Sequence, residues 1–217
     1  MHKIYLIRHG ETEATRLRKF EGSGLVSGLG SPLTSKGVFQ ALMVANALAS
    51  KEISIVYASP LLRAAQTARI IAERAGVALK VEPDLREGSF GLWERLTFDE
   101  IQANYPEEVE RWFENPVDFV PPQGESVQQI ADRVLPCIDL LARELPSRPG
   151  SCAVVAHGGP IRAALSMYLS GNLEQFGAIQ QAMGAINTLR FVLGVVVVED
   201  VNAIPPGKWT DVFSRGS

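Results

Sequence analysis

The sequence is poor in the residues that build disulfide frameworks and metal centres. Its 217 residues include two cysteines and three histidines. Cys137 and Cys152 form no CxxC pair, and neither an HxH nor an HExxH spacing occurs, so the common zinc signatures are missing. We therefore expect two free thiols in a reducing compartment, no disulfide and no metal site.

Long hydrophobic runs and an excess of basic residues are also lacking. The apolar run at residues 191–198 is much shorter than the roughly 20 residues that cross a membrane. An earlier apolar run is interrupted almost at once by Arg8 and His9, which is not typical of a signal peptide. The formal net charge of −3 gives no support to general nucleic-acid binding. We expect a cytoplasmic protein with neither a membrane nor a nucleic acid as its partner.

Two widespread catalytic motifs are absent as well. The sequence has no GxxxxGK[ST] loop, which excludes a P-loop enzyme, and no GxSxG elbow, which leaves a serine hydrolase unsupported. Its composition is that of a globular protein, with 46% hydrophobic and 21% charged residues. At this length we expect a single domain over residues 1–217.

Strand-like and helix-like runs alternate along the chain. Hydrophobic periodicity predicts strands at residues 3–8, 53–58, 77–81 and 151–156, and helices at about 35–50, 59–75, 125–145 and 159–171. Ser59, followed by a proline, and Ser126 are the predicted helix caps. Residues 187–200 form two β-rich runs around Gly194. The pattern predicts a three-layer α/β/α fold with a mainly parallel central sheet and an edge hairpin.

Two segments stand apart from this alternation. Residues 20–31 hold four glycines and are expected to form a flexible loop. Residues 88–125 hold seven of the sixteen aromatic residues and show several short helical pieces. We interpret the second segment as a small helical lid inserted in the domain, although a satellite hydrophobic cluster is an equally good interpretation.

Two histidines follow predicted strands. His9 ends the first strand and is flanked by Arg8 and a glycine, and His157 ends the strand at 151–156 in the same setting, before Gly158. Ligands of parallel sheets bind beyond the carboxyl ends of the strands, so both imidazoles are expected in one pocket. A lone histidine in such a place would more often be structural, but here the setting occurs twice.

Other candidates are weaker when each is taken alone. Arg63 falls in the first turn of a predicted helix, where it is either solvated or paired with an anion. Glu87 follows the third strand and could be an ordinary loop residue. Thr15 could donate to an oxyanion or serve as a local cap. Together with Arg8, Arg63 favours a phosphoryl group over a metal cation, because a guanidinium matches phosphate oxygens.

Taken in order, these motifs resemble the histidine phosphatase superfamily, in the phosphoglycerate mutase-like branch that carries an RHG motif. The matching pieces are Arg8-His9-Gly10-Glu11-Thr12; Pro32-Leu33-Thr34 with Gly37 and Gln40-Ala41; Ser59 with Arg63-Ala64 and Gln66-Thr67-Ala68; Leu85-Arg86-Glu87 with Gly91 and Trp93-Glu94; Gly124-Glu125-Ser126 with Arg133; and His157-Gly158-Gly159. Each piece is weak alone, but six pieces in the right order make chance a poor explanation.

The resemblance implies a role for each matching residue. His9 would attack phosphorus and become a transient phosphohistidine, while Arg8, Arg63 and His157 would hold the phosphoryl oxygens. Glu87 would protonate the leaving oxygen and then activate water. The implied phosphate-binding set is Arg8, Thr15, Arg63, His157 and Gly158. The implied chemistry needs neither a metal nor a cofactor.

The sequence departs from the family pattern in four places. Thr15 replaces an asparagine, Gly30 an aspartate and Arg95 a glycine, and the glycine-rich loop at 20–31 is longer than usual. These departures are expected to affect pocket shape or substrate choice more than phosphoryl chemistry. A basic cluster at Arg16, Arg18 and Lys19 is either solvated or binds a second anionic group.

The charge of residues 93–118 bears on the choice of activity. This segment carries eight acidic and two basic residues, which disfavours a highly anionic ligand. The predicted activity is therefore hydrolysis of a small phosphomonoester, with aryl, nucleoside-like or ribazole leaving groups suited to the aromatic residues. A cofactor-dependent phosphoglycerate mutase and a non-catalytic pseudo-phosphatase remain alternatives. The oligomeric state is left as monomer or homodimer.

Overall fold

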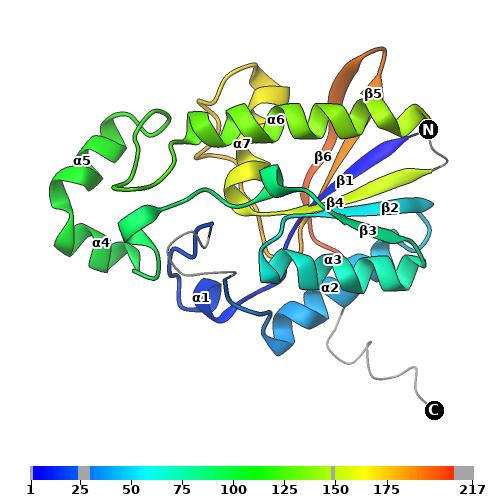
Figure 1. Ribbon diagram of the computed structural model, residues 1–217, viewed down its shortest axis with the longest axis horizontal. Helices are drawn as coiled ribbons and strands as arrows, with labels where there is room; N and C mark the ends of the chain where they lie inside the picture. The colour runs from blue at the N-terminus through cyan, green and yellow to red at the C-terminus, as the bar shows by residue number, and fades with distance from the viewer. Residues whose placement is uncertain (1, 24–29, 148–149, 208–217) are drawn as a thin grey trace.

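The computed structural model describes residues 2–23, 30–147 and 150–207 and is built on a six-stranded sheet (Figure 1). The strand order is β3-β2-β4-β1-β5-β6. The strands are β1 (Lys3–Arg8), β2 (Ile53–Ala58), β3 (Ala78–Val81), β4 (Ser151–Ala156), β5 (Ile186–Val192) and β6 (Val195–Ala203). Strands β1 to β4 are parallel, whereas β5 and β6 form an antiparallel hairpin at one edge. The predicted mainly parallel sheet with an edge hairpin is confirmed.

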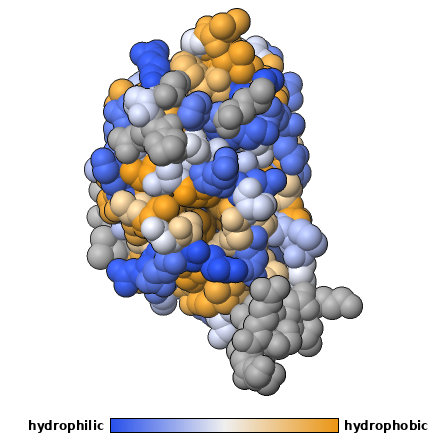
Figure 2. All heavy atoms as spheres, turned by 90° about the vertical axis from the view of Figure 1, so that its right-hand side faces the viewer, coloured by the Kyte–Doolittle hydropathy of each residue, from blue (hydrophilic) through white to orange (hydrophobic). Residues whose placement is uncertain are grey.

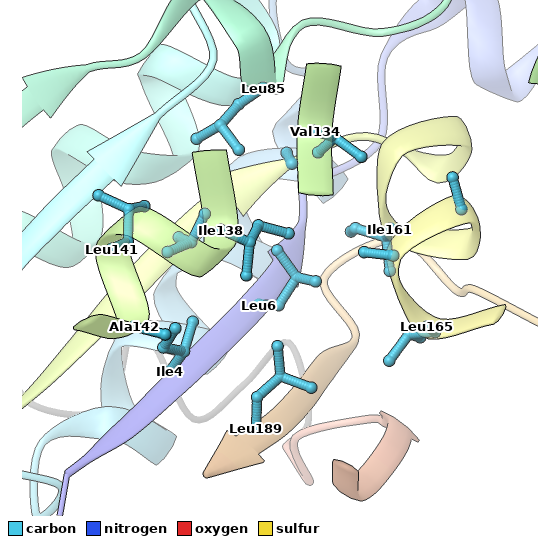
Figure 3. Packing of buried hydrophobic residues seen from close by; sticks show 14 of the residues in the cluster. Ile4, Leu6, Leu85, Val134, Ile138, Leu141, Ala142, Ile161, Leu165 and Leu189 are labelled. Atoms are coloured by element: carbon cyan, nitrogen blue, oxygen red, sulfur yellow. The ribbon is translucent and has the colours of Figure 1, made fainter. Parts of the chain in front are cut away.

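Helices cover both faces of the sheet, which confirms the three-layer prediction. On one face lie α2 (Ser35–Leu48) and α3 (Leu62–Ala75), and on the other α6 (Val127–Glu144) and α7 (Gly158–Ser170) (Figure 1). Strand β1 shows why both faces are apolar: Ile4 and Leu6 point to the α6 and α7 side, and Tyr5 and Ile7 to the other. Figure 3 shows the first of these two cores.

Most helix boundaries agree with those predicted from the sequence, and the differences are the start of α3 and the short helix α1. Ser126 caps α6 as predicted, in a reciprocal capping box with Gln129. Ser59, however, does not cap α3, so that prediction was wrong. The helix begins at Leu62, after an N-cap at Leu61 that makes no side-chain hydrogen bond. A four-residue helix, α1 (Glu13–Arg16), was not predicted, because one turn is too short to show periodicity.

Residues 88–125 form a helical excursion between β3 and α6. It contains α4 (Phe98–Asn104) and α5 (Pro106–Glu114), which stand beyond the sheet at the left of Figure 1. Trp93, Ile101 and Val109 are the buried residues of its own hydrophobic cluster, separate from the two sheet cores. The predicted small helical insertion is therefore present, and we call it the 88–125 insertion.

The surface at the end of the molecule away from the 88–125 insertion mixes hydrophilic and hydrophobic residues (Figure 2). Within the described ranges, no helix combines the length and apolarity that crossing a membrane requires. Part of the glycine-rich loop, residues 24–29, lies outside the described residues, so the prediction of a flexible loop concerns a segment that is only partly described.

Candidate active site

The two histidines meet because their strands are neighbours. Strands β1 and β4 are paired in parallel with Arg8 opposite Ala156, so His9 and His157 both follow at the carboxyl edge. Their ring centroids lie 5.0 Å apart, and both side chains are buried. The two imidazoles come together as predicted, but of the two only His9 lines the cavity.

The hydrogen bonds of His9 determine which nitrogen carries its proton. Nδ1 lies 2.7 Å from the carbonyl oxygen of Gly10, an acceptor, so Nδ1 is the protonated nitrogen. Nε2 therefore keeps its lone pair and accepts a hydrogen bond of 3.1 Å from Arg63 Nε. Burial, followed by the charges of Arg63 and Arg8, holds the pKa of His9 well below its usual range. The result is a neutral imidazole with its basic nitrogen beside two arginines.

Two guanidinium groups lie near His9, that of Arg63 fully buried and that of Arg8 half-buried. Arg63 is 1% exposed, and its Nη2 donates to the Gly22 carbonyl oxygen at 2.8 Å. Arg8 donates from Nη1 to the Gln181 carbonyl oxygen, and burial lowers its pKa to about 10. Arg8 Nε and Arg63 Nη1 are buried without a hydrogen-bond acceptor in the described part of the chain, although Nη1 lies 3.4 Å from a Glu21 carboxylate oxygen. These donors are arranged to receive an anion.

His157 is hydrogen-bonded to Ser59, a residue whose role in the site was not predicted from the sequence. Its Nε2 lies 2.7 Å from Ser59 Oγ, and its Nδ1 is buried with no partner among the described residues. Burial, with the charge of Arg63 second, keeps the pKa of His157 well below its usual range. Ser59 looked like a helix cap because a proline follows it, yet its hydroxyl orients a site histidine.

Glu87 reaches the same site from the loop after β3. Its Oε1 accepts from the backbone N–H of Gly88 at 2.9 Å and from that of Gly159 at 3.1 Å. Gly159 lies in the first turn of α7, where backbone N–H groups have no partner within the helix and are free to bind a side-chain oxygen. A Cβ at Gly159 would clash with Glu87 Oε1, so the contact needs glycine at this position.

A cavity of about 370 Å³ is lined by His9, the two arginines and Glu87, whereas His157 lies behind its wall. The site residues in its wall are Arg8, His9, Thr15, Arg63, Glu87 and Gly158. Phe90, Trp93, Trp112 and Phe119 of the 88–125 insertion form its apolar side. The hydroxyl of Thr15 is occupied in the cap of α1, where it donates to the carbonyl oxygen of Thr12. Phosphate binding by Thr15 stays a prediction.

Three further cationic residues line the cavity: Arg18, Lys19 and Arg162. Arg16, the third member of the predicted basic cluster, instead forms an exposed ion pair with Glu13. Sequence reasoning missed Arg162, which lies four residues after Gly158 and so on the same face of α7. Its Nε is buried and has no partner in the described ranges. No group of three or more His, Cys, Asp or Glu residues suited to a metal occurs among the described residues.

Two of the departures from the family pattern have structural explanations. A Cβ at Gly30 would lie 2.7 Å from Arg63 Nη1, so glycine leaves room for that guanidinium. Arg95 has φ of 72°, a left-handed conformation that glycine adopts without strain. The family glycine at this position thus reflects the backbone, and arginine is accommodated there at some cost in conformational energy.

Comparisons with known proteins agree with this geometry. The model of the histidine phosphatase superfamily (branch 1) matches residues 4–204, and the chain belongs to this family. It is 31% identical over 189 residues to a putative phosphoserine phosphatase 2 of Hydrogenobacter thermophilus, covering 87% of this chain and 89% of that one. It is 36% identical over 164 residues to a probable phosphoglycerate mutase of Photorhabdus laumondii, covering 73% and 70%.

Solved structures show the same fold. A mycobacterial glucosyl-3-phosphoglycerate phosphatase in complex with VO3 superimposes with a TM-score of 0.78 at 28% identity, over 94% of this chain and 100% of that one. A phosphoserine phosphatase mutant of Entamoeba histolytica in complex with phosphoserine has a TM-score of 0.79 at 26% identity, over 94% and 98%. Family and relatives together support phosphatase activity.

Proposed function

We propose that the protein is a metal-independent phosphomonoesterase that works through a phosphohistidine on His9. The observation that carries the proposal is the state of His9: Nδ1 is bound to the Gly10 carbonyl, so Nε2 presents a lone pair beside Arg63. Arg8 and His157 add further donors around the position that a phosphoryl group would take.

The reaction has two halves. First, His9 Nε2 attacks phosphorus, the ester P–O bond breaks, and the leaving oxygen takes a proton from Glu87. Then Glu87 takes a proton from water, the water oxygen attacks phosphorus, and the P–N bond breaks. Phosphate and neutral His9 are regenerated. The two arginines neutralise the charge that develops on the phosphoryl oxygens in both halves.

The substrate is proposed to carry an anionic group besides its phosphate. Arg162 supports this, because it places an unpaired, buried guanidinium nitrogen in the cavity wall away from any described carboxylate partner. Several relatives are named as phosphatases of phosphoserine or of glucosyl-3-phosphoglycerate, and both compounds contain a carboxylate. The apolar wall formed by the 88–125 insertion would contact the rest of the leaving group.

A phosphoglycerate mutase is the second candidate, since the chain also resembles a probable member of that class. Incubation with 3-phosphoglycerate and 2,3-bisphosphoglycerate separates the two activities. The proposal predicts phosphate release. Fast formation of 2-phosphoglycerate without comparable phosphate release would identify a mutase instead.

The catalytic claim itself is tested with p-nitrophenyl phosphate at mildly acidic pH. Removing the nucleophile in His9→Ala should abolish turnover, because no other described imidazole has its basic nitrogen beside Arg63. Equal rates for the variant and the parent protein would show that His9 is not the nucleophile. Absence of turnover in both, across a panel of phosphorylated metabolites, would favour a pseudo-phosphatase.

A further inference from the structure

One arginine outside the cavity uses all of its hydrogen-bonding capacity on the segment that carries Glu87. Arg133 lies on α6, and its side chain is 11% exposed. A guanidinium has five N–H donors, and five hydrogen bonds from Arg133 are present. Three of them end on backbone carbonyl oxygens: Asp84 at 2.7 Å, Arg86 at 2.8 Å and Glu87 at 3.1 Å.

The other two bonds go to a carboxylate that holds the far side of the same segment. Arg133 Nε and Nη2 each lie 3.1 Å from an oxygen of Glu125, the bidentate arrangement in which arginine binds most strongly. Glu125 Oε2 also accepts the backbone N–H of Ser89 at 2.9 Å. The pair Glu125 and Arg133 therefore fixes the backbone on both sides of Glu87.

The charge state of Glu125 agrees with this arrangement. Burial on its own raises the pKa of the Glu125 carboxyl, but the hydrogen bonds and charge of Arg133, with the Ser89 N–H and Arg86, bring it below its usual value. Glu125 is thus ionised at neutral pH, which keeps the bidentate contact intact.

Glu87 needs such support because of where it lies. It follows the 3-10 helix at Pro83–Leu85 and precedes the 88–125 insertion, so neither a strand nor an α-helix holds its backbone. Its own carboxylate is held by the N–H groups of Gly88 and Gly159. Proton transfer depends on placement to a fraction of an ångström, and a shift of about 1 Å can cost roughly 10²-fold in rate.

We propose that Arg133, held by Glu125, is a positioning residue that sets the placement of Glu87 for proton transfer to the leaving oxygen. The proposal rests on the proposed function, in which Glu87 is the proton donor. In the first half of the reaction, which kcat/KM reports, Arg133 then matters mainly for substrates whose leaving group needs a proton; the water step of the second half is common to all substrates.

The test compares two substrates. Protonation matters little for p-nitrophenyl phosphate, whose leaving group is a good one, and matters strongly for an alkyl phosphate such as phosphoserine. Arg133→Gln should lower kcat/KM on the alkyl phosphate by about 10²-fold, at the lower end of what general acid catalysis contributes, and change kcat/KM on p-nitrophenyl phosphate much less. Arg133→Lys keeps the charge with fewer donors, so it should lose an intermediate factor.

A double variant separates positioning from general destabilisation. In a Glu87→Gln background, Arg133→Gln should cause little further loss on the alkyl phosphate, because both changes remove the same proton transfer. Arg143→Gln, an exposed arginine on the same helix, is the matched control and should leave both rates unchanged. If Arg133→Gln does not fold, Arg133→Lys carries the same comparison.

Two results would overturn the proposal. One is an equal loss of kcat/KM on both substrates, which a merely structural arginine would produce, and the other is an unchanged kcat/KM on the alkyl phosphate. Failure of the proposed function looks different, because then Glu87→Gln alone would leave alkyl phosphate hydrolysis intact.

Discussion

At the residue scale, the site combines two buried, neutral histidines with a buried arginine, Arg63, and a half-buried one, Arg8. Burying a guanidinium is costly, and the Glu21 carboxylate 3.4 Å from Arg63 Nη1 offsets part of that cost. Burial and the arginine charges keep His9 unprotonated, which leaves a lone pair on its Nε2 in mildly acidic solution. The same property ties the stability of the protein to pH.

Acidification should destabilise the fold through these histidines. On unfolding, His9 and His157 regain their ordinary pKa near 6.5, whereas in the folded protein both pKa values are depressed. Below that pH the unfolded chain binds more protons, so the free energy of unfolding falls by up to about 1.4 kcal/mol per pH unit for each histidine. Urea unfolding at several pH values should show a shallower loss in His157→Gln than in the parent protein.

The matched control for this experiment is Gln102→Ala, an exposed residue of α4 whose side chain does not titrate. Its pH dependence should follow that of the parent protein. If His157→Gln lost stability with the same slope as the parent, His157 would have to be protonated in the folded state, contrary to the account.

Arg162 offers a second prediction at this scale. Arg162→Gln should raise KM for phosphoserine or 3-phosphoglycerate about 10- to 100-fold, the value of a charged hydrogen bond of roughly 1.5–3 kcal/mol. The KM for p-nitrophenyl phosphate, which has no second anionic group, should change little. Arg111→Gln, an exposed arginine of the 88–125 insertion, serves as control. Equal effects on both substrates would mean that Arg162 contacts the reacting phosphate instead.

Some site residues could be predicted from their sequence context, and others could be identified only from the structure. His9 and His157 were predicted because each ends an apolar strand, and strand order then brings them together. Ser59 was misinterpreted, since its sequence setting fits a cap as well as a partner for His157. Arg162 was missed because a helical arginine is usually solvated, and only the packed structure shows its buried Nε.

At the element scale, the start of α7 supports Glu87 through a glycine. Gly159→Ala should push the Glu87 carboxylate away, because the new Cβ would clash with its Oε1. We expect a lower kcat/KM on alkyl phosphates and a smaller effect on kcat/KM for p-nitrophenyl phosphate. Gly177→Ala is the control, since a Cβ there meets nothing within 4 Å. An unaltered rate on alkyl phosphates would show that Glu87 acts from another position.

The regular elements were predictable for a simple physical reason. Strands β1, β2 and β4 are short, apolar and buried, and the long helices have strong periodicity or caps, as at Ser126. Two features were not predictable. The short helix α1 depends on the cap at Thr12. The start of α3 could not be placed because the Ser59 hydroxyl binds His157 instead of capping the helix.

At the scale of the whole molecule, the carboxyl edge of the sheet carries the candidate site, and the 88–125 insertion forms much of the apolar wall of its cavity. The insertion packs its own cluster around Trp93, and four of its aromatic residues line the cavity. The sequence indicated such an insertion from its aromatic content but could not show which rings face the site. Substrate choice is therefore expected to depend on the insertion, and the reaction on the carboxyl edge of β1 and β4.

The proposed function depends on transfer of the phosphoryl group to His9 as a phosphohistidine intermediate. Rapid quenching of the protein during turnover, followed by mass spectrometry of its peptides under conditions that preserve phosphohistidine, tests it directly. The account predicts an acid-labile phosphoryl group on His9, more abundant in Glu87→Gln with a good leaving group, because water activation is then slowed, and absent in His9→Ala. A phosphoryl group on another residue, or steady turnover by His9→Ala, would contradict the account.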